Sequence, residues 1–285
     1  MKRLIAMVCS GWATLLLAGC GTGSVDSMDD EGRTGEVREA LTNSNAMNPN
    51  AMNPNAMNPN AMNPNAMNPN ALSPSAMSAS AMTALQDPGS AGDLSRQLLK
   101  YTVSCALTPS QSFSFSWTDA AGVVHAEVYP GLLGLASAWA TAPLSTSGAE
   151  WVSACLASRV NRYGVPVMLS SRGTVTQLST EAPERASYPM IEGAFFGNLF
   201  TATPAVYTCY TGDNIANSRS LQRDCATGHV NADGTVSSCG ILQILGSCAD
   251  FCSSIQAAKQ YYPSCYTTSG HLGTPTSTVV TTALP

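Results

Sequence analysis

Glu192 is the acidic side chain whose surroundings could make it chemically active. It is the one charged residue between Arg185 and Asp213, and its neighbours within four positions are mostly apolar. Burial would raise the pKa of such a carboxyl and let it act as a general acid. Paired with His125 or His229, it would form a hydrolytic site. The simpler interpretation, which we favour, places Glu192 on the exposed face of a half-buried strand.

Other catalytic signals are absent from the sequence. It contains no G-x-S-x-G, no H-E-x-x-H, no Walker phosphate loop and no C-x-x-C-H motif. The three histidines are His125, His229 and His271, and the last lies in a Thr-rich segment. The sequence therefore favours a non-enzymatic protein and indicates no cofactor.

The first 20 residues have the features of an export signal. Lys2 and Arg3 precede an apolar run over 4–17, which is about 14 residues long and too short to cross a bilayer. The run ends in Leu17-Ala18-Gly19-Cys20, which resembles the lipobox of bacterial lipoproteins. The resemblance implies removal of residues 1–19 and attachment of a diacylglyceryl group, with acyl chains such as palmitate, to Cys20. The alternative is an ordinary secretory signal in which Cys20 is incidental.

The residues after Cys20 bear on the destination. In the lipoprotein family an Asp at that place retains the protein in the inner membrane, whereas this chain has Gly21, Thr22 and Gly23. The resemblance therefore implies an outer-membrane lipid anchor, with the protein exposed to the periplasm or the cell surface. The signal contains two of the 13 basic residues, so the mature chain has 11 basic against 18 acidic side chains, a formal charge of −7. This balance excludes a basic nucleic-acid-binding surface.

A proline-containing repeat follows the signal. After an acidic stretch over 21–39, Ala recurs every five residues from Ala46 to Ala81, with Pro in a fixed register up to Pro74. A proline at that spacing removes hydrogen bonds from both helices and strand ladders. Asn-Pro-Asn-Ala instead favours type I turns. We therefore predict that residues 20–92 are a disordered tether, although a Met-rich binding surface or an oxidant sink is an open alternative.

Eight further cysteines indicate disulfide bonds. Their number is even and the chain is exported, which predicts four disulfides over Cys105, Cys155, Cys209, Cys225, Cys239, Cys248, Cys252 and Cys265. Cys105 and Cys155 are the only two of the eight in the first half of the globular part, and each lies on a predicted helix, so we expect them to pair. Cys248 and Cys252 are four apart after the helix cap Ser247, and should bond to two different loops.

Metal binding is the alternative use of this Cys-rich segment. His229 follows Cys225 by four residues, but the cysteine spacings do not give the two close pairs of a zinc ribbon. His229, Asn231, Asp233 and Gly234 resemble the start of a calcium loop, yet the twelfth position is Gly240, where that loop needs a bidentate Glu. An Asp-Gly turn explains the same residues, so no metal is predicted.

The helix and strand signals give an α+β fold. Periodic apolar residues and caps predict a helix from Asp93 to Cys105 and another with a capping box at Ser147 and Glu150. An aromatic hairpin is expected over 112–118 and 123–129. Strands are expected over 165–169, 191–196 and 205–210. The predicted organisation is a signal at 1–19, the tether at 20–92, an α+β domain at 93–204, a Cys-rich disulfide subdomain at 205–266 and a Thr-rich tail at 267–285.

These observations lead to two expectations about function. The first is a lipid-anchored cell-envelope protein with a binding or structural role, whose partners are the membrane and either cell-wall polymer or another surface protein. A long tether supports it, because reach helps contact with a polymer or another cell. The second is an exported hydrolase of cell-wall polysaccharide or peptide that uses Glu192 with His125 or His229.

Overall fold

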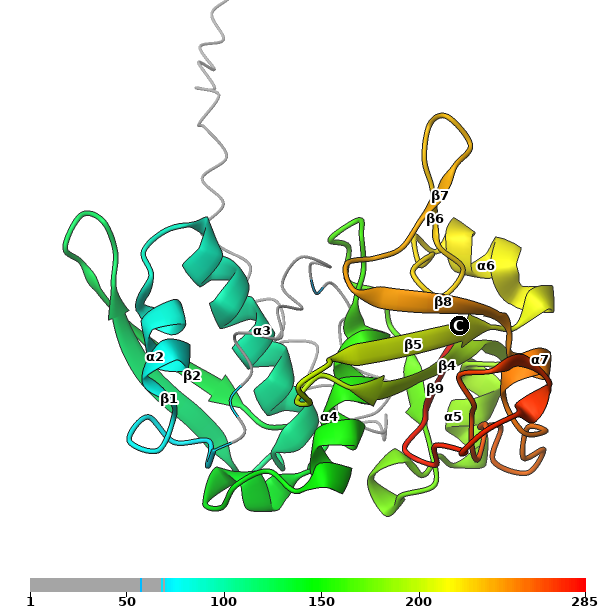
Figure 1. Cartoon of the computed structure of the whole chain (residues 1–285), viewed down its shortest axis with the longest axis horizontal. Coiled ribbons are helices and arrows are strands. Elements are labelled where there is room, and N and C mark those ends of the chain that lie inside the picture. The colour runs from blue at the N-terminus through cyan, green and yellow to red at the C-terminus, as the bar shows by residue number, and fades with distance from the viewer. Residues whose placement is uncertain (1–56, 58–67, 69) are drawn as a thin grey trace, which may run out of the picture. The chain divides into compact units, whose positions relative to one another are not determined.

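A five-stranded mixed sheet forms the centre of the protein (Figure 1). The computed structural model describes Met57, Asn68 and residues 70–285, and the fold is α+β. Neighbouring strands of the sheet are antiparallel except β5 and β8, which are parallel. In spatial order the strands are β3 (Ser170–Arg172), β9 (Val280–Leu284), β4 (Met190–Asn198), β5 (Ala205–Tyr210) and β8 (Leu242–Ser247).

Strand β9 changes the predicted domain organisation. We expected residues 267–285 to form a Thr-rich tail, but β9 lies between β3 and β4, and all five of its residues are buried. Its β-branched Thr281 and Thr282 suit a pleated strand. Strands β5 and β8, from the expected Cys-rich subdomain, belong to the same sheet. Strands from all three of the predicted segments, 93–204, 205–266 and 267–285, therefore lie in one sheet, which the boundaries predicted at 205 and 267 do not divide.

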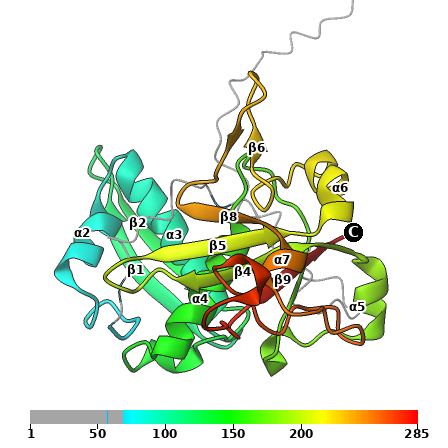
Figure 2. The same ribbon diagram turned by 45° about the vertical axis from the view of Figure 1, so that its right-hand side comes forward.

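The sheet is buried on both faces. Phe195 of β4 and Val206 of β5 join the core beneath helix α4 (Thr146–Arg159). Phe196 points the other way, into a second core formed with cysteines and loops of the C-terminal region. Figure 2 shows β4, β5 and β8 running side by side near α4 and α7 (Cys248–Phe251). Burial on both faces explains why β4 reads as a nearly continuous apolar run.

Helices α3 (Ser90–Ala106) and α4 pack together and are joined by the Cys105–Cys155 disulfide. The cap residues differ from those expected. Ser145, two residues before the predicted Ser147, accepts a hydrogen bond from the Gly148 amide at 3.1 Å and begins α4. Helix α3 begins after Gly89, so that Asp93 lies in its first turn.

The predicted aromatic hairpin is present as β1 (Ser112–Thr118) and β2 (Val124–Pro130). Phe113 and Phe115 are buried, and the hairpin packs against α3 and α2 (Ala79–Gln86). The turn is held by Asp119, whose carboxylate accepts the amides of Ala121 and Val123. Alternation of Ser with large aromatic residues is enough to specify this element, because one face must be buried.

The end of the repeat is folded rather than disordered. Met57 is fully buried and Leu72 is 4 % exposed, both within the main core. No proline follows Pro74 until Pro88, and between them Ser78 caps α2 by accepting the Ala81 amide. The prediction of a disordered tether over 20–92 is therefore wrong for Met57, Asn68 and 70–92. The rest of that range, with Cys20 and the signal, lies outside the described residues.

Short elements fill the remaining chain. Residues 165–169, which we expected to form a strand, are not in one. The first strand of the five-stranded sheet in chain order is β3. The predicted strands at 191–196 and 205–210 are confirmed by β4 and β5. The others are α5 (Ala182–Ser187), α6 (Ile215–Ser220), the β6 (His229–Val230) and β7 (Val236–Ser237) pair, and 3₁₀ turns at Ser137–Ala140, Thr176–Leu178, Gly212–Asn214 and Ser269–His271.

All eight cysteines from Cys105 onward form disulfides. The Cys105–Cys155 pairing is the one expected from the sequence. Cys248 and Cys252 bond to different segments, as expected, and not to each other. The remaining pairs are Cys209–Cys248, Cys225–Cys239 and Cys252–Cys265. Several disulfides in one folded unit indicate an extracytoplasmic protein.

Candidate functional site

A buried carboxylate, Asp224, is the centre of the polar cluster best suited to chemistry. Its Oδ2 accepts a hydrogen bond from the Tyr163 hydroxyl at 2.9 Å and lies 2.7 Å from Nδ1 of His229. The Asp224 side chain is 3 % exposed, whereas that of His229 is 20 % exposed. The imidazole therefore lies between a buried anion and the surface.

Three separate segments bring these side chains together. Tyr163 lies in the turn after α4, where the Asn161 side chain accepts the Tyr163 amide and donates to the carbonyls of Val165 and Gln222. Asp224 follows α6, and the adjacent Cys225–Cys239 disulfide closes the loop that carries β6 and β7. The disulfide and the Asn161 bonds thus hold the cluster from both sides.

The cluster has the parts of a general base. A histidine oriented through Nδ1 by a carboxylate presents Nε2 on the other side of its ring, where it can accept a proton. Ser237 is paired with His229 across β6 and β7, so its hydroxyl lies on the same face of this ribbon. Arg162 approaches that hydroxyl at 3.4 Å. Burial and the hydrogen bond to Asp224 raise the pKa of Tyr163, which keeps its phenol protonated.

Glu192 lies elsewhere and has a structural role. Its carboxylate receives two hydrogen bonds from Arg223, at 2.7 and 3.1 Å, and a third from Thr282. The Arg223 guanidinium also donates to the carbonyls of Ser158 and Val160 at the end of α4. Glu192 is 1 % exposed, so the expectation that it faces solvent is wrong. Because Arg223 occupies both oxygens, the carboxyl cannot serve as the predicted general acid.

A β-bulge explains the orientation of Glu192. The register of β4 against β9 shifts between Ile191 and Gly193, which leaves Glu192 as the extra residue. A bulge of this kind re-aims a side chain and breaks the two-residue alternation from which the sequence prediction was made. Gly193 allows β5 to approach closely, since a Cβ there would lie 2.1 Å from the Cys209 carbonyl oxygen.

His125 lies neither in the Asp224 cluster nor beside Glu192, but on the β1–β2 hairpin. Its Nε2 lies 2.9 Å from Asp119, and its ring stacks on Trp117 with centroids 4.5 Å apart. The Arg96 guanidinium lies 3.6 Å from the centroid of the Trp117 ring. The hydrogen bond from His125, with those from the Val123 and Ala121 amides, lowers the pKa of Asp119.

The three residues proposed from the sequence therefore do not form one site. Glu192 and His229 are linked only indirectly. Arg223 binds Glu192, and the next residue, Asp224, contacts His229. Sequence reasoning missed Asp224 and Tyr163. A signal for the first was present, since Asp224 lies beside a cysteine and five residues before His229.

The segment considered for calcium forms a tight turn. Asp233 Oδ1 accepts the amide and hydroxyl of Thr235, and these bonds lower the pKa of the Asp233 carboxyl. Gly234 adopts φ of +80°, which glycine allows at low cost. Cys225 is in a disulfide and so offers no thiolate for zinc.

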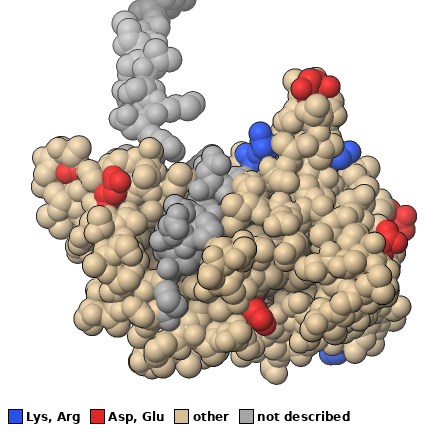
Figure 3. All heavy atoms as spheres, viewed as in Figure 1, with Lys and Arg blue, Asp and Glu red and all other residues tan. Residues whose placement is uncertain are grey.

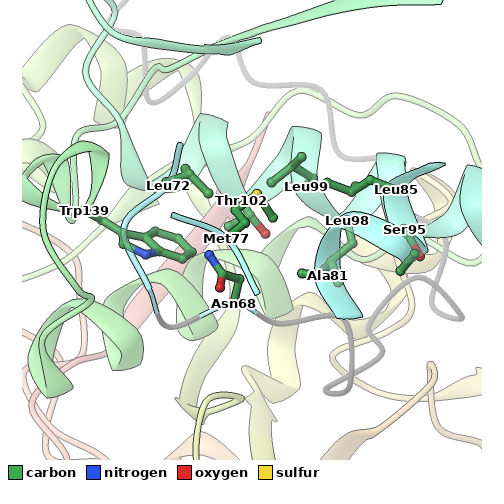
Figure 4. A pocket seen from close by; sticks show the side chains of 11 residues that line it. Asn68, Leu72, Met77, Ala81, Leu85, Ser95, Leu98, Leu99, Thr102 and Trp139 are labelled. Carbon is green, nitrogen blue, oxygen red and sulfur yellow. The ribbon is translucent and has the colours of Figure 1, made fainter. Parts of the chain in front are cut away.

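Two of the cavities among the described residues have polar or aromatic side chains in their lining. One of about 20 Å³ is lined by apolar side chains of α2 and α3 with Asn68, Leu72 and Trp139 (Figure 4). The other, of about 210 Å³, is lined by the loop 173–180 together with Lys259 and Tyr261. Neither of these two cavities is lined by Asp224 or His229.

The surface and the comparisons complete the description. In the view of Figure 3 charged atoms are sparse and widely spaced over the described part of the protein, in keeping with a charged fraction of 11 %. Among the described residues, no helix has the length and apolar character needed to span a membrane. No family model, curated protein or solved structure matches this chain.

Proposed function

We propose that this chain is a lipid-anchored protein of the bacterial cell envelope, held at the outer membrane through Cys20, with a binding or structural role. The single observation that carries the proposal is the set of four disulfides, which requires an oxidising compartment. These bonds use every cysteine of the folded part. Cys20 is not among these eight cysteines, and its lipobox-like setting is what supports a lipid there.

A sparsely charged surface supports binding to an uncharged or weakly charged partner. On one face of the β1–β2 hairpin, Ser114 and Ser116 of β1 lie opposite Val128 and Ala126 of β2. Val124 and Val128 are 67 % and 63 % exposed. The hairpin is a two-stranded sheet with no third strand among the described residues, so its edges and this face are available for contact. Cell-wall polymer or another surface protein is the partner we propose.

The anchor is tested by replacing its thiol. With Cys20→Ala we expect the protein to leave the membrane fraction and to lose incorporation of labelled fatty acid, because the acyl chains supply the membrane affinity. Cys9→Ala is the matched control and should stay membrane-bound and labelled. Membrane retention of unlabelled Cys20→Ala would refute the lipid anchor.

The binding role has a separate test. Purified protein is mixed with isolated cell-wall polymer, and the bound fraction is measured by co-sedimentation. Val124→Asp and Val128→Asp together should lower binding at least tenfold, whereas Val236→Asp, which changes a 59 % exposed valine on β7, should leave it unchanged. Equal binding by both variants would exclude the hairpin face as the contact surface.

The His229–Asp224 contact supports hydrolysis as a second candidate function. Here His229 would accept a proton from an attacking water or hydroxyl, and Asp224 would orient the ring. Turnover of cell-wall glycan, peptide and simple esters by wild type is compared with His229→Ala, with His125→Ala as control. Activity that His229→Ala abolishes and His125→Ala preserves supports this candidate, and absence of turnover by wild type excludes it.

A further inference from the structure

Met57, from the third Ala-Met-Asn-Pro-Asn unit, is bound at the end of α4. Its amide donates to the Arg159 carbonyl at 3.2 Å, and its carbonyl accepts the Asn161 amide at 2.9 Å. These two bonds form a parallel bridge to Val160, and the Met57 side chain is fully buried in the main core. We call this place, formed by Arg159, Val160 and Asn161, the repeat seat.

The seat recognises features that every unit possesses. Two of its contacts are to backbone, which is the same for any residue, and the third is burial of one methionine. The chain contains five identical units, which begin at Ala46, Ala51, Ala56, Ala61 and Ala66. Nothing in the sequence of the third unit distinguishes it from the first or second.

We propose that the repeat seat is a binding site for one Ala-Met-Asn-Pro-Asn unit and accepts other units of the same chain in place of the third. The fifth unit is held separately, because its Asn68 accepts the Ser78 amide and its Asn70 carbonyl accepts the Trp139 indole. The fifth unit is therefore the fixed end of the loop that runs from the seated unit to Asn68. We call each choice of seated unit a register.

Loop closure sets the relative populations of the registers. Ten residues separate Met57 from Asn68, 15 separate Met52 and 20 separate Met47. Only five separate Met62, and loops this short do not follow the scaling used here. The probability that a loop closes falls as the three-halves power of its length, so Met52 should be about half, and Met47 about a third, as populated as Met57. These differences are small, so the seat selects a unit only weakly.

The register also sets the length of chain between the lipid and the folded part. With Met57, Met52 or Met47 seated, 36, 31 or 26 residues follow Cys20 before the seat. The reach of the protein would therefore change in steps of five residues. This consequence rests on the proposed anchor at Cys20, whereas the register exchange does not.

The experiment measures hydrogen–deuterium exchange of the Asn161 amide in the full chain, because that amide donates a hydrogen bond to the seated unit. Protection is the factor by which this bond slows the exchange. Met57→Asp should lower its protection only about twofold, since Met52 and Met47 take over. The combined variant Met47→Asp, Met52→Asp, Met57→Asp and Met62→Asp should lower it at least about thirtyfold, the scale expected for truncating a buried methionine.

Leu72→Asp is the matched control. Leu72 is 4 % exposed and its amide donates to the Trp139 carbonyl, but its Ala-Leu-Ser-Pro-Ser unit occurs once in the sequence. No other unit can replace it, so protection of the Leu72 amide should fall at least about thirtyfold in this single variant.

Each outcome decides the proposal. A small loss in Met57→Asp with a large loss in the combined variant supports it. A loss in Met57→Asp as large as in Leu72→Asp overturns it, as does unchanged protection in the combined variant. Light scattering on the same samples tests the source of the unit. Protection that depends on concentration and appears with a dimer shows that a neighbouring chain fills the seat, which overturns binding within one chain.

Discussion

Two histidine–aspartate pairs with nearly equal contact distances occur in different regions of the protein. His229 lies 2.7 Å from Asp224 beside the β6–β7 pair, and His125 lies 2.9 Å from Asp119 on the β1–β2 hairpin. Their exposures differ. The Asp224 side chain is 3 % exposed and that of Asp119 is 29 % exposed. Distance therefore does not distinguish the two pairs, whereas burial does.

The surroundings show why burial matters. Asp224 follows Arg223, which binds Glu192 and the carbonyls at the end of α4. The His229–Asp224 pair is therefore adjacent to a buried polar network. Asp119 instead accepts the amides of its own turn, where water and salt screen its charge. A buried polar network resists the loss of any member, whereas an exposed pair contributes little. Four experiments test this contrast.

Arg223→Met should have the largest effect. It leaves the Glu192 carboxylate buried without its cation, which typically costs about 3–5 kcal/mol. For a folded part of roughly 200 residues, the melting temperature should fall by about 10 °C. Thermal unfolding measures this. Adding Glu192→Met should recover much of the loss, and a double variant no more stable than the single one would show that the charge is not the cause.

Asp224→Ala should destabilise the fold by about 1–3 kcal/mol in denaturant unfolding, because Tyr163 and His229 lose their shared acceptor. Asp224→Asn keeps the shape and one acceptor, so it should lose less. The same substitution at the exposed pair, Asp119→Ala, is the comparison. If Asp119→Ala proved as destabilising as Asp224→Ala, burial would not be what separates the two regions.

Trp117→Leu should lower stability by about 1–2 kcal/mol. It removes the cation–π contact with Arg96, whose side chain is 6 % exposed, and the stack with His125. The neighbouring Ser116→Ala, on the exposed face of the same strand, should be neutral. Equal loss from both changes would indicate that strand propensity matters here and the ring contacts do not.

The smallest effect is expected at Asp119 and appears in its titration. Hydrogen bonds in the folded state lower the pKa of Asp119, so folding is favoured above its unfolded pKa and this contribution is lost as the pH falls through the folded value. NMR titration of the carboxyl measures the shift. His125→Ala should raise the pKa toward its usual range, and no change would remove His125 as the main cause.

Local signals in the sequence were sufficient for some parts of the structure. The aromatic hairpin was predicted correctly because alternation and a turn lie within twenty residues. Disulfide use followed from cysteine number and export. The orientation of Glu192 was predicted incorrectly, since it depends on a bulge against β9, a strand about 90 residues away. The folding of Met57 and Leu72 was missed because their partners, Val160 and Trp139, also lie far away in the sequence.

The sequence by itself thus predicted an extracytoplasmic protein, the α+β class and the elements whose signals are contiguous. The tertiary structure alone decided that residues 280–284 form a central strand, that Asp224 rather than Glu192 orients a histidine, and that the repeat contributes to the core. The physical reason is that burial and pairing across long sequence separations depend on the whole packed arrangement. Local patterns carry no information about which distant segment will supply a partner.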